Sequence, residues 1–309
     1  MHSTLHKATA TGFLAVLVWA TLAAITVYAG AIPPLQLVAM SFTLASLIGA
    51  VYLASSAQAR AGLARLRWPP LLLGVAGLFG YHSLYFLALQ TAPAVEASLV
   101  NYLWPVLIVL FSTLLPRSRG GQKLTPWHVA GASLAFTGAA LAITGGGEIA
   151  LTGHAVGYAA ALAAAFTWSI YSVASRFFRE VPSSAVAVFC AVTAVGAWIA
   201  HSMTETFVLP DTLSQVMAVL ALGLGPVGIA FYVWDYGCKH GDIRLLGVSA
   251  YFAPLLSTVI LVALGLAEAK PALWAAALLI TLGALLAAKE TLRPTPGGAA
   301  AAEANASGN

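Results

Sequence analysis

Ten apolar stretches, each about twenty residues long, follow one another along almost the whole chain. An α-helix needs about 20 apolar residues to cross the hydrocarbon core of a bilayer. The stretches cover residues 9–28, 34–55, 69–90, 94–115, 126–144, 154–175, 184–203, 213–237, 244–266 and 271–289. Charged residues make up 8% of the chain, whereas soluble domains average about 25%. The sequence therefore predicts an all-α polytopic membrane protein with ten transmembrane helices.

The basic residues gather between alternate stretches. Thirteen of the 14 lysines and arginines fall on one side of the predicted membrane, and they are Lys7, Arg60, Arg65, Arg67, Arg117, Arg119, Lys123, Arg176, Arg179, Lys239, Arg244, Lys289 and Arg293. Cytoplasmic loops of membrane proteins are enriched in lysine and arginine. The distribution predicts that both termini are cytoplasmic. It also accounts for the net charge of +4 without a nucleic-acid partner.

Aromatic residues and prolines recur at a constant separation of 149 residues. The pairs are Trp19 and Trp168, Tyr102 and Tyr251, and Pro105 and Pro254. Since each copy then holds five spans, the second copy enters the membrane from the opposite side, as in the inverted repeats of many secondary transporters. We expect one five-helix repeat over residues 1–149, a second over 150–292, and a disordered tail over 293–309.

Pro105 and Pro254 fall inside predicted spans. A proline within a helix removes a backbone hydrogen bond and kinks or breaks the helix. In lipid such a break is tolerated only beside protein or a water-filled cavity. Polar and aromatic residues precede both prolines, in Asn101-Tyr102-Leu103-Trp104 and in Ser249-Ala250-Tyr251. We predict that both positions are helix breaks that act as hinges beside a cavity.

Two further spans carry aromatic and polar residues at helical spacing. Tyr81 and Tyr85 lie four residues apart and share a helix face beside His82, and Trp168 and Tyr171 lie three apart. A site for an aromatic solute combines flat apolar walls with a few hydrogen-bonding groups. We predict a substrate cavity lined by Trp19, Tyr81, His82, Tyr85, Asn101, Tyr102, Trp104, Trp168, Tyr171, Ser249 and Tyr251. Helix packing explains each tryptophan equally well when it is taken alone.

Together these features resemble the drug/metabolite transporter superfamily. The most specific is Val100-Asn101-Tyr102-Leu103-Trp104-Pro105, accompanied by Trp19 and by Tyr251-Phe252-Ala253-Pro254. Over residues 8–290 the chain is similar to the EamA-type ten-span exporters, and among them to the YddG-type aromatic amino-acid exporters of bacterial inner membranes. The resemblance implies a basket-like bundle whose central cavity is lined mainly by spans 1, 3, 4, 6, 8 and 9. It also implies export of aromatic and other neutral amino acids and of some toxic amphipathic compounds.

The acidic residues bear on energy coupling. A carboxylate at the bilayer centre costs about 2.5–3.5 kcal/mol, and those that remain usually serve coupling or substrate binding. The first predicted span contains none, while Glu96 and Asp235 lie near span ends. We expect a uniporter that works by alternating access. His82, Glu96 and Asp235 are the candidate coupling groups of the alternative, a proton-coupled exporter of other small metabolites or drugs.

Other activities leave weaker signals in the sequence. A channel would need a polar ring or a carbonyl filter, an intramembrane enzyme would need converging catalytic groups, and a nucleotide-sugar transporter would need basic residues inside its cavity. The chain has no phosphate-binding glycine loop ending in lysine, and its histidines lack metal-ligand spacing. We therefore expect a protein that is not an enzyme, with no cofactor, no metal site and no obligate protein partner.

Overall fold

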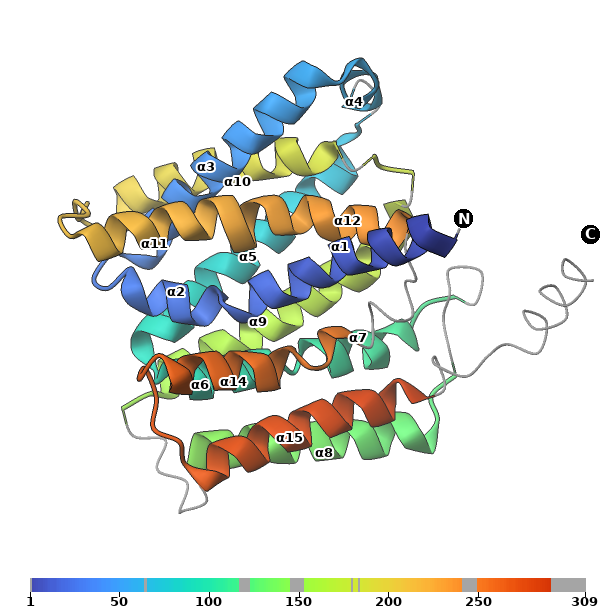
Figure 1. Ribbon diagram of the computed structural model, residues 1–309, viewed down its shortest axis with the longest axis vertical. Coiled ribbons are helices and arrows are strands. Elements are labelled where there is room, and N and C mark those ends of the chain that lie inside the picture. Colours follow the sequence, from blue (N-terminus) through green and yellow to red (C-terminus); the bar gives the residue numbers. More distant parts are fainter. Residues whose placement is uncertain are drawn as a thin grey trace, which may run out of the picture.

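The protein is all-helical in the residues that its computed structural model describes, which are 2–63, 66–116, 123–144, 153–178, 180–182, 184–240 and 249–289. Most helices run along one common direction (Figure 1). In chain order they are α1 (His2–Ala20), α2 (Leu22–Tyr28), α3 (Pro34–Ser55), α4 (Ala57–Leu63), α5 (Trp68–Thr91), α6 (Ala94–Asn101), α7 (Trp104–Ser112), α8 (Pro126–Thr144), α9 (Ala155–Ala174), the 3₁₀ turn η2 (Ser175–Phe178), α10 (Ala185–Thr204), α11 (Leu213–Leu224), the π turn η3 (Gly225–Ile229), α12 (Ala230–His240), α14 (Ala253–Ala263) and α15 (Pro271–Ala287).

These helices match the predicted spans. Within the described residues, eight helical segments are long and apolar enough to cross a membrane, and α14 and α15 are shorter apolar helices. Prolines stand in the first turn of α3, α5, α8 and α15, where a missing N–H costs nothing and the fixed φ favours a helix. The prediction of an all-helical membrane protein is confirmed. Residues 244–248 of the ninth predicted span, the repeat boundary at 149/150 and the tail 293–309 lie outside the described residues.

The helix breaks predicted at the two prolines are present and have the same hydrogen-bonding pattern. In the first break, the Leu103 N–H donates to the Val100 carbonyl three residues back, at 3.2 Å. In the second, the Phe252 N–H donates to the Ser249 carbonyl at 3.1 Å. Helices α7 and α14 resume one residue later, at Trp104 and Ala253. All three pairs of positions are separated by 149 residues.

Two further breaks were not predicted. The first span is interrupted at Thr21, between α1 and α2. The eighth span, predicted as one run over 213–237, widens into the π turn η3, which contains Pro226. In the predicted repeat, the counterpart of the first span is α9 and that of the eighth span is α5, and both of these helices are continuous. The short helix α4 was also missed; Arg60 within it donates to the carbonyls of Leu53 and Ala54 at 2.7 and 2.9 Å and so caps α3.

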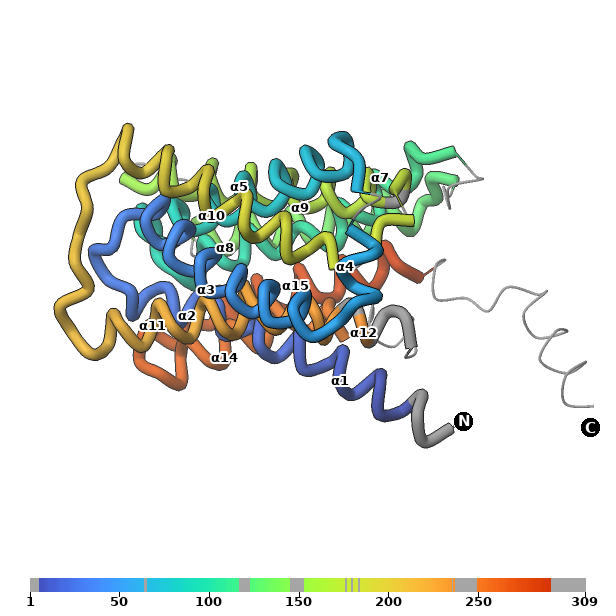
Figure 2. The backbone as a smooth tube through the Cα atoms, turned by 90° about the horizontal axis from the view of Figure 1, so that it is seen from above, coloured from blue at the N-terminus to red at the C-terminus, as the bar shows by residue number. Residues whose placement is uncertain are grey.

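The helices pack in four pairs, α8 with α15, α3 with α10, α5 with α9, and α1 with α12. Seen from above in Figure 2, α1 and α12 lie on one face of the bundle and α5 and α9 on the other. The outer pair α8 and α15 is especially close, because a Cβ atom on Gly131 would lie 2.5 Å from the Gly283 carbonyl oxygen. Close backbone approach of this kind replaces the hydrophobic driving force that is missing between helices in lipid.

Candidate functional site

A small cavity lies between the α1–α12 pair and the α5–α9 pair. It is lined by Val16, Trp19, Leu22, Tyr81, His82, Tyr85, Asn101, Tyr102, Trp104, Trp168, Phe231, Ala250 and Ala253. Its volume is about 50 Å³, which is room for only a few water molecules. The lining comes from both sequence halves and from both proline breaks, so the fold brings distant segments to one place.

The structure brings eight of the eleven predicted cavity residues together in this wall. The other three lie close by but outside it. Tyr171 packs over Gly77 of α5, with its ring centroid 5.3 Å from that of Trp168. Ser249 and Tyr251 are half-buried in the break before α14, and their neighbours Ala250 and Ala253 line the cavity instead. The break changes which residues of this segment face the cavity, so the inward-facing residues are not those that a continuous helix would present.

Aromatic rings form most of the cavity wall. Trp168 of α9 lies 5.1 Å from Tyr81 of α5 and 6.2 Å from Phe231 of α12, measured between ring centroids. Phe231 in turn lies 5.9 Å from Trp19 of α1, edge to face. These are favourable distances for aromatic pairs. The rings therefore form one connected layer that joins all four central helices.

The polar groups of the cavity are few and specific. Asn101 is buried, and its Nδ2 donates to Tyr81 Oη at 3.1 Å. Its Oδ1 is buried without a hydrogen-bond partner. Tyr85 Oη donates to Ser98 Oγ at 3.0 Å. The Asn101 side-chain oxygen is thus left without a partner. A buried acceptor without a partner is costly, and a solute that donates a hydrogen bond to it would remove that cost.

Two side chains reach backbone carbonyls at the helix breaks. Trp19 Nε1 donates to the carbonyl of Pro226 in the π turn at 3.1 Å. Ser169 Oγ lies 3.1 Å from the carbonyl of Trp104 at the first proline break and also donates within α9. Irregular backbone inside a membrane protein needs such partners because lipid offers none. These contacts attach α1 to the π turn η3 and α9 to α7 at the level of the cavity.

His82 is almost fully buried among rings. Its Nδ1 lies 2.8 Å from the Leu78 carbonyl, and because a carbonyl only accepts, Nδ1 carries a proton. The rings within 6.3 Å of it are Phe42, Tyr81, Phe86 and Phe231. Within the described residues no carboxylate is paired with this imidazole. His82 therefore lies among aromatic rings, with a backbone carbonyl as its hydrogen-bond partner.

Of the two acidic coupling candidates, Glu96 lies outside the cavity wall. Glu96 is in the first turn of α6, where its Oε2 accepts a hydrogen bond of 2.6 Å from Tyr158 Oη of α9. Asp235 belongs to α12, but its side chain is outside the described residues. Across the described part of the chain, no group of three or more His, Cys, Asp or Glu side chains is placed to hold a metal ion.

Phe231 is the aromatic lining residue that sequence reasoning missed. The signal was the Gly225-Pro226 dipeptide within an apolar run, which marks a break one turn before Phe231. The smaller residues Val16, Leu22, Ala250 and Ala253 were also missed. Nothing in their residue type distinguishes them from the many other small apolar residues of the chain.

Comparison with known proteins decides the family. The EamA-like transporter family matches residues 6–144 and 155–289. The chain belongs to this EamA-like transporter family. Its members are transporters and not enzymes, as the sequence predicted.

Several relatives match this chain over nearly its whole length. An aromatic amino acid exporter YddG from Ancylobacter novellus is 49% identical over 285 residues, which are 91% of this chain and 96% of the relative. The protein of the same name from Escherichia coli is 28% identical, over 92% of this chain and 97% of its own. A solved crystal structure is 46% identical, with a TM-score of 0.71 over 92% of this chain and 97% of that one.

Proposed function

We propose that this protein exports aromatic and other neutral amino acids across a bacterial inner membrane. The observation that carries the proposal is the cavity wall, where a connected layer of aromatic rings surrounds a buried amide oxygen without a partner. Flat apolar walls suit an aromatic side chain, and an acceptor suits an ammonium group. The 49% identical relative that is named an aromatic amino acid exporter supports the same substrate class.

The proposal assigns a partner to the polar part of the substrate. Asn101 Oδ1 would accept from the ammonium group, while the substrate ring would stack on Trp168 and Tyr81. Trp104, Tyr102 and the other predicted lining residues would close the pocket around it. Every described lysine and arginine lies outside the cavity wall, which disfavours a phosphorylated substrate.

Substrate binding requires the aromatic layer to open. The cavity of about 50 Å³ is well below the roughly 300–1,000 Å³ of small-molecule sites, so rings must separate before an amino acid enters. We infer alternating access by two inverted repeats, residues 1–149 and 150–292, in a basket-like bundle with cytoplasmic termini. The matching proline breaks support this repeat, and Pro105 and Pro254 would be its hinges.

Uniport is the mode of transport that we favour. His82 is surrounded by rings and a carbonyl. Glu96, at the start of α6, accepts a hydrogen bond from Tyr158. Among the described residues, neither His82 nor Glu96 takes part in an ion pair. The second candidate, a proton-coupled exporter of other metabolites, keeps support from one observation, the buried ionisable His82 on the cavity wall.

Counterflow in liposomes tests the proposal. The purified protein is reconstituted, and uptake of labelled phenylalanine, tryptophan and threonine is measured with and without a pH gradient. We expect counterflow of the aromatic amino acids that does not depend on the pH gradient. Uptake only under a proton gradient would favour the coupled exporter, and absence of uptake for all three amino acids would refute the proposed substrate class.

A further inference from the structure

Phe231 of the cavity wall lies at the junction of two helix pairs. Its ring centroid is 6.2 Å from that of Trp168 of α9 and 6.3 Å from that of His82 of α5. It also contacts Trp19 of α1 at 5.9 Å, edge to face. Phe231 belongs to α12, which packs on α1. A side chain of the α1–α12 pair thus reaches the α5–α9 pair across the cavity.

The surroundings of Phe231 are those that an aromatic solute requires. Its phenyl ring is tilted by 36° from the ring of Trp168 and stands at steep angles, 73° and 61°, to the rings of His82 and Trp19. Tilted and edge-to-face arrangements are favoured for aromatic pairs. The cavity that remains beside these rings is about 50 Å³, whereas a cavity of about 150 Å³ is known to hold benzene. A second ring therefore does not fit while Phe231 is in place.

The polar part of the same cavity is in the opposite condition. Asn101 Oδ1 is buried without a hydrogen-bond partner. Asn101 Nδ2 donates to Tyr81 Oη, and the ring of Tyr81 lies 5.1 Å from that of Trp168. The protein's own phenyl group thus fills the aromatic part of the site, while the acceptor for an ammonium group is unmet. A solute ring that stacks on Trp168 competes with Phe231 for the same aromatic surface.

Two helix breaks lie next to these rings. The first span is interrupted at Thr21, two residues after Trp19, and the π turn η3 ends two residues before Phe231. Trp19 Nε1 donates to the Pro226 carbonyl within η3 at 3.1 Å, and its ring contacts Trp234 of α12 at 5.3 Å. Beyond the breaks the same two spans continue as α2 and α11 (Figure 1). We call α1 and α12 the arm, because both helices end at these breaks and pack on each other.

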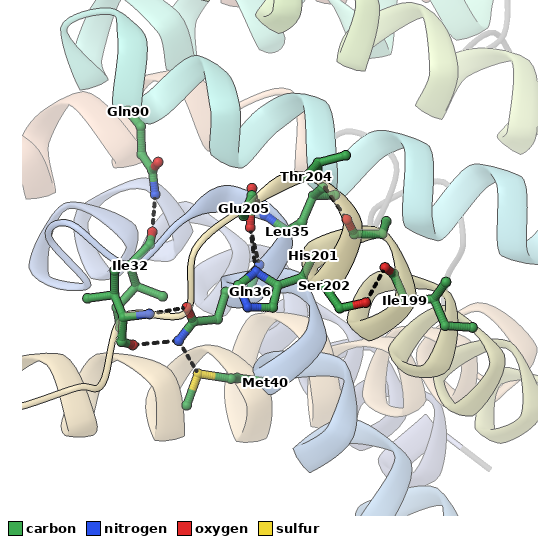
Figure 3. A network of polar contacts seen from close by, with 12 residues as sticks. Ile32, Leu35, Gln36, Met40, Gln90, Ile199, His201, Ser202, Thr204 and Glu205 are labelled. Atoms are coloured by element: carbon green, nitrogen blue, oxygen red, sulfur yellow. Dashed lines mark hydrogen bonds and ion pairs between the residues drawn. The ribbon is translucent and has the colours of Figure 1, made fainter.

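The neighbouring helices α3 and α10 are joined by direct polar contacts. Glu205, directly after α10, accepts from two backbone N–H groups at the start of α3, at 2.9 and 3.0 Å (Figure 3). The Gln36 side chain pairs with both polar backbone groups of Val208, at 2.6 and 2.8 Å. By contrast, α12 meets α3 through the rings of Tyr52 and Tyr232, 5.7 Å apart, and Tyr232 Oη has no hydrogen-bond partner. We call α3 and α10 the frame, because charged hydrogen bonds are about twice as strong as neutral ones.

We propose that Phe231 holds the place of the solute's aromatic ring in the empty cavity, and that the arm swings about the breaks at Thr21 and η3 to withdraw it. A solute then binds only to the fraction of molecules from which this ring has withdrawn, and its apparent affinity is reduced by that fraction. An aromatic solute regains the ring contacts that Phe231 gives up, so the exchange favours aromatic solutes. This inference deepens the proposed function and rests on it for the class of solute.

Equilibrium binding of labelled phenylalanine to the purified protein tests the proposal. In Phe231→Ala the competing ring is gone, so the dissociation constant should fall about tenfold, the size expected when two ring contacts need no longer be broken. Phe166→Ala is the matched control, because Phe166 is 38% exposed and pairs with Phe111 at 5.7 Å outside the cavity wall. It should leave the dissociation constant unchanged.

The direction of the change decides between two roles of the ring. A higher dissociation constant in Phe231→Ala would overturn the proposal, because the solute would then pack on Phe231 as on a fixed wall. An unchanged value would overturn it too. Phe231→Leu protects the test against a folding defect, since it keeps most of the apolar volume and removes the flat ring. It should lower the dissociation constant by a smaller factor, and a rise would contradict the proposal.

Toluene separates this inference from the proposed substrate class, because it has a ring but no ammonium or carboxylate group. At ten times its dissociation constant, it should raise the unfolding temperature of Phe231→Ala by about 3 °C relative to Phe166→Ala. Equal shifts in the two variants would refute a place for a ring at Phe231. A selective shift together with no binding of phenylalanine in any variant would refute the amino-acid substrate class and leave the place of the ring standing.

Spin-label distances test the swing of the arm. In a background lacking Cys190 and Cys238, one label pair joins the arm to the frame, Leu14→Cys of α1 with Val195→Cys of α10. The other pair lies within the frame, Leu47→Cys of α3 with Val195→Cys. All three side chains are more than half exposed. Saturating phenylalanine should shift the distance between arm and frame and leave the distance within the frame unchanged. An unchanged arm-to-frame distance, or an equal shift in both pairs, would overturn the swing.

Discussion

Asn101 has one partnered and one unpartnered polar end, and replacing it with leucine tests the proposed substrate site. Its Nδ2 donates to Tyr81 Oη at 3.1 Å, while its buried Oδ1 has no partner. A net hydrogen bond contributes about 0.5–1.5 kcal/mol to stability, whereas a buried unpartnered acceptor costs about 1–3 kcal/mol. In Asn101→Leu the free energy lost with the hydrogen bond to Tyr81 is matched or exceeded by the free energy gained when the unpartnered oxygen is removed. We expect the unfolding temperature of the substrate-free protein to stay the same or rise.

Transport should respond to Asn101→Leu in the opposite direction. An ammonium group bonded to Oδ1 is a charged hydrogen bond, which contributes about 1.5–3 kcal/mol. Its loss corresponds to about a 10- to 100-fold rise in the substrate concentration that gives half-maximal counterflow. The assay is counterflow of labelled phenylalanine in liposomes, with thermal unfolding in detergent measured on the same preparation.

Tyr81→Phe is the control for the other end of the amide. It removes the acceptor for Nδ2 and leaves that donor unpaired, so stability should fall by about 1–3 kcal/mol. Adding Tyr81→Phe to Asn101→Leu should cost much less, since neither partner then remains. An unchanged half-saturating concentration in Asn101→Leu would refute the assignment of Oδ1 to the substrate.

Three further predictions concern the helices around the site. Gly131→Ala should destabilise the protein by about 1–3 kcal/mol because the added Cβ meets the facing backbone of α15. Gly196→Ala is the control: no atom lies within 4 Å of the added Cβ, so it should be neutral or stabilising by up to about 1 kcal/mol. Thermal unfolding compares the two variants, and equal losses of stability would contradict the packing argument. Trp19→Phe should lower the flux at unchanged expression because it removes the indole bond to the carbonyl in the interrupted eighth span, and normal flux would show that this bond is dispensable. Pro105→Ala and Pro254→Ala each remove the ring that keeps the helix broken, so both should let the break straighten and slow counterflow; faster flux in either variant would count against a hinge role.

Much of the cavity could be predicted because two sequence signals coincide there. The prolines are incompatible with an uninterrupted helix, so Pro105 and Pro254 fixed where backbone irregularity must lie. The aromatic and amide residues beside them had to face protein or a cavity, since lipid satisfies no polar group. This reasoning placed Asn101, Tyr102 and Trp104 beside a cavity, and in the structure all three line the small cavity described above.

The same reasoning failed at two other breaks. Thr21 interrupts the first span with neither proline nor glycine, and the π turn at Pro226 was read as part of a continuous helix. Because a break rotates the residues beyond it, Phe231 on the cavity wall was missed.

The sequence by itself determined the spans, their apolar lengths and the duplicated proline breaks, because these follow from what lipid does to an unpaired backbone group. The tertiary structure decided which aromatic rings touch and which carbonyl each side chain reaches. It also decided that Glu205 meets the start of α3, 170 residues away in the chain. Such contacts depend on how helices from two halves are paired and rotated, and no local pattern encodes the position of a partner so distant in sequence.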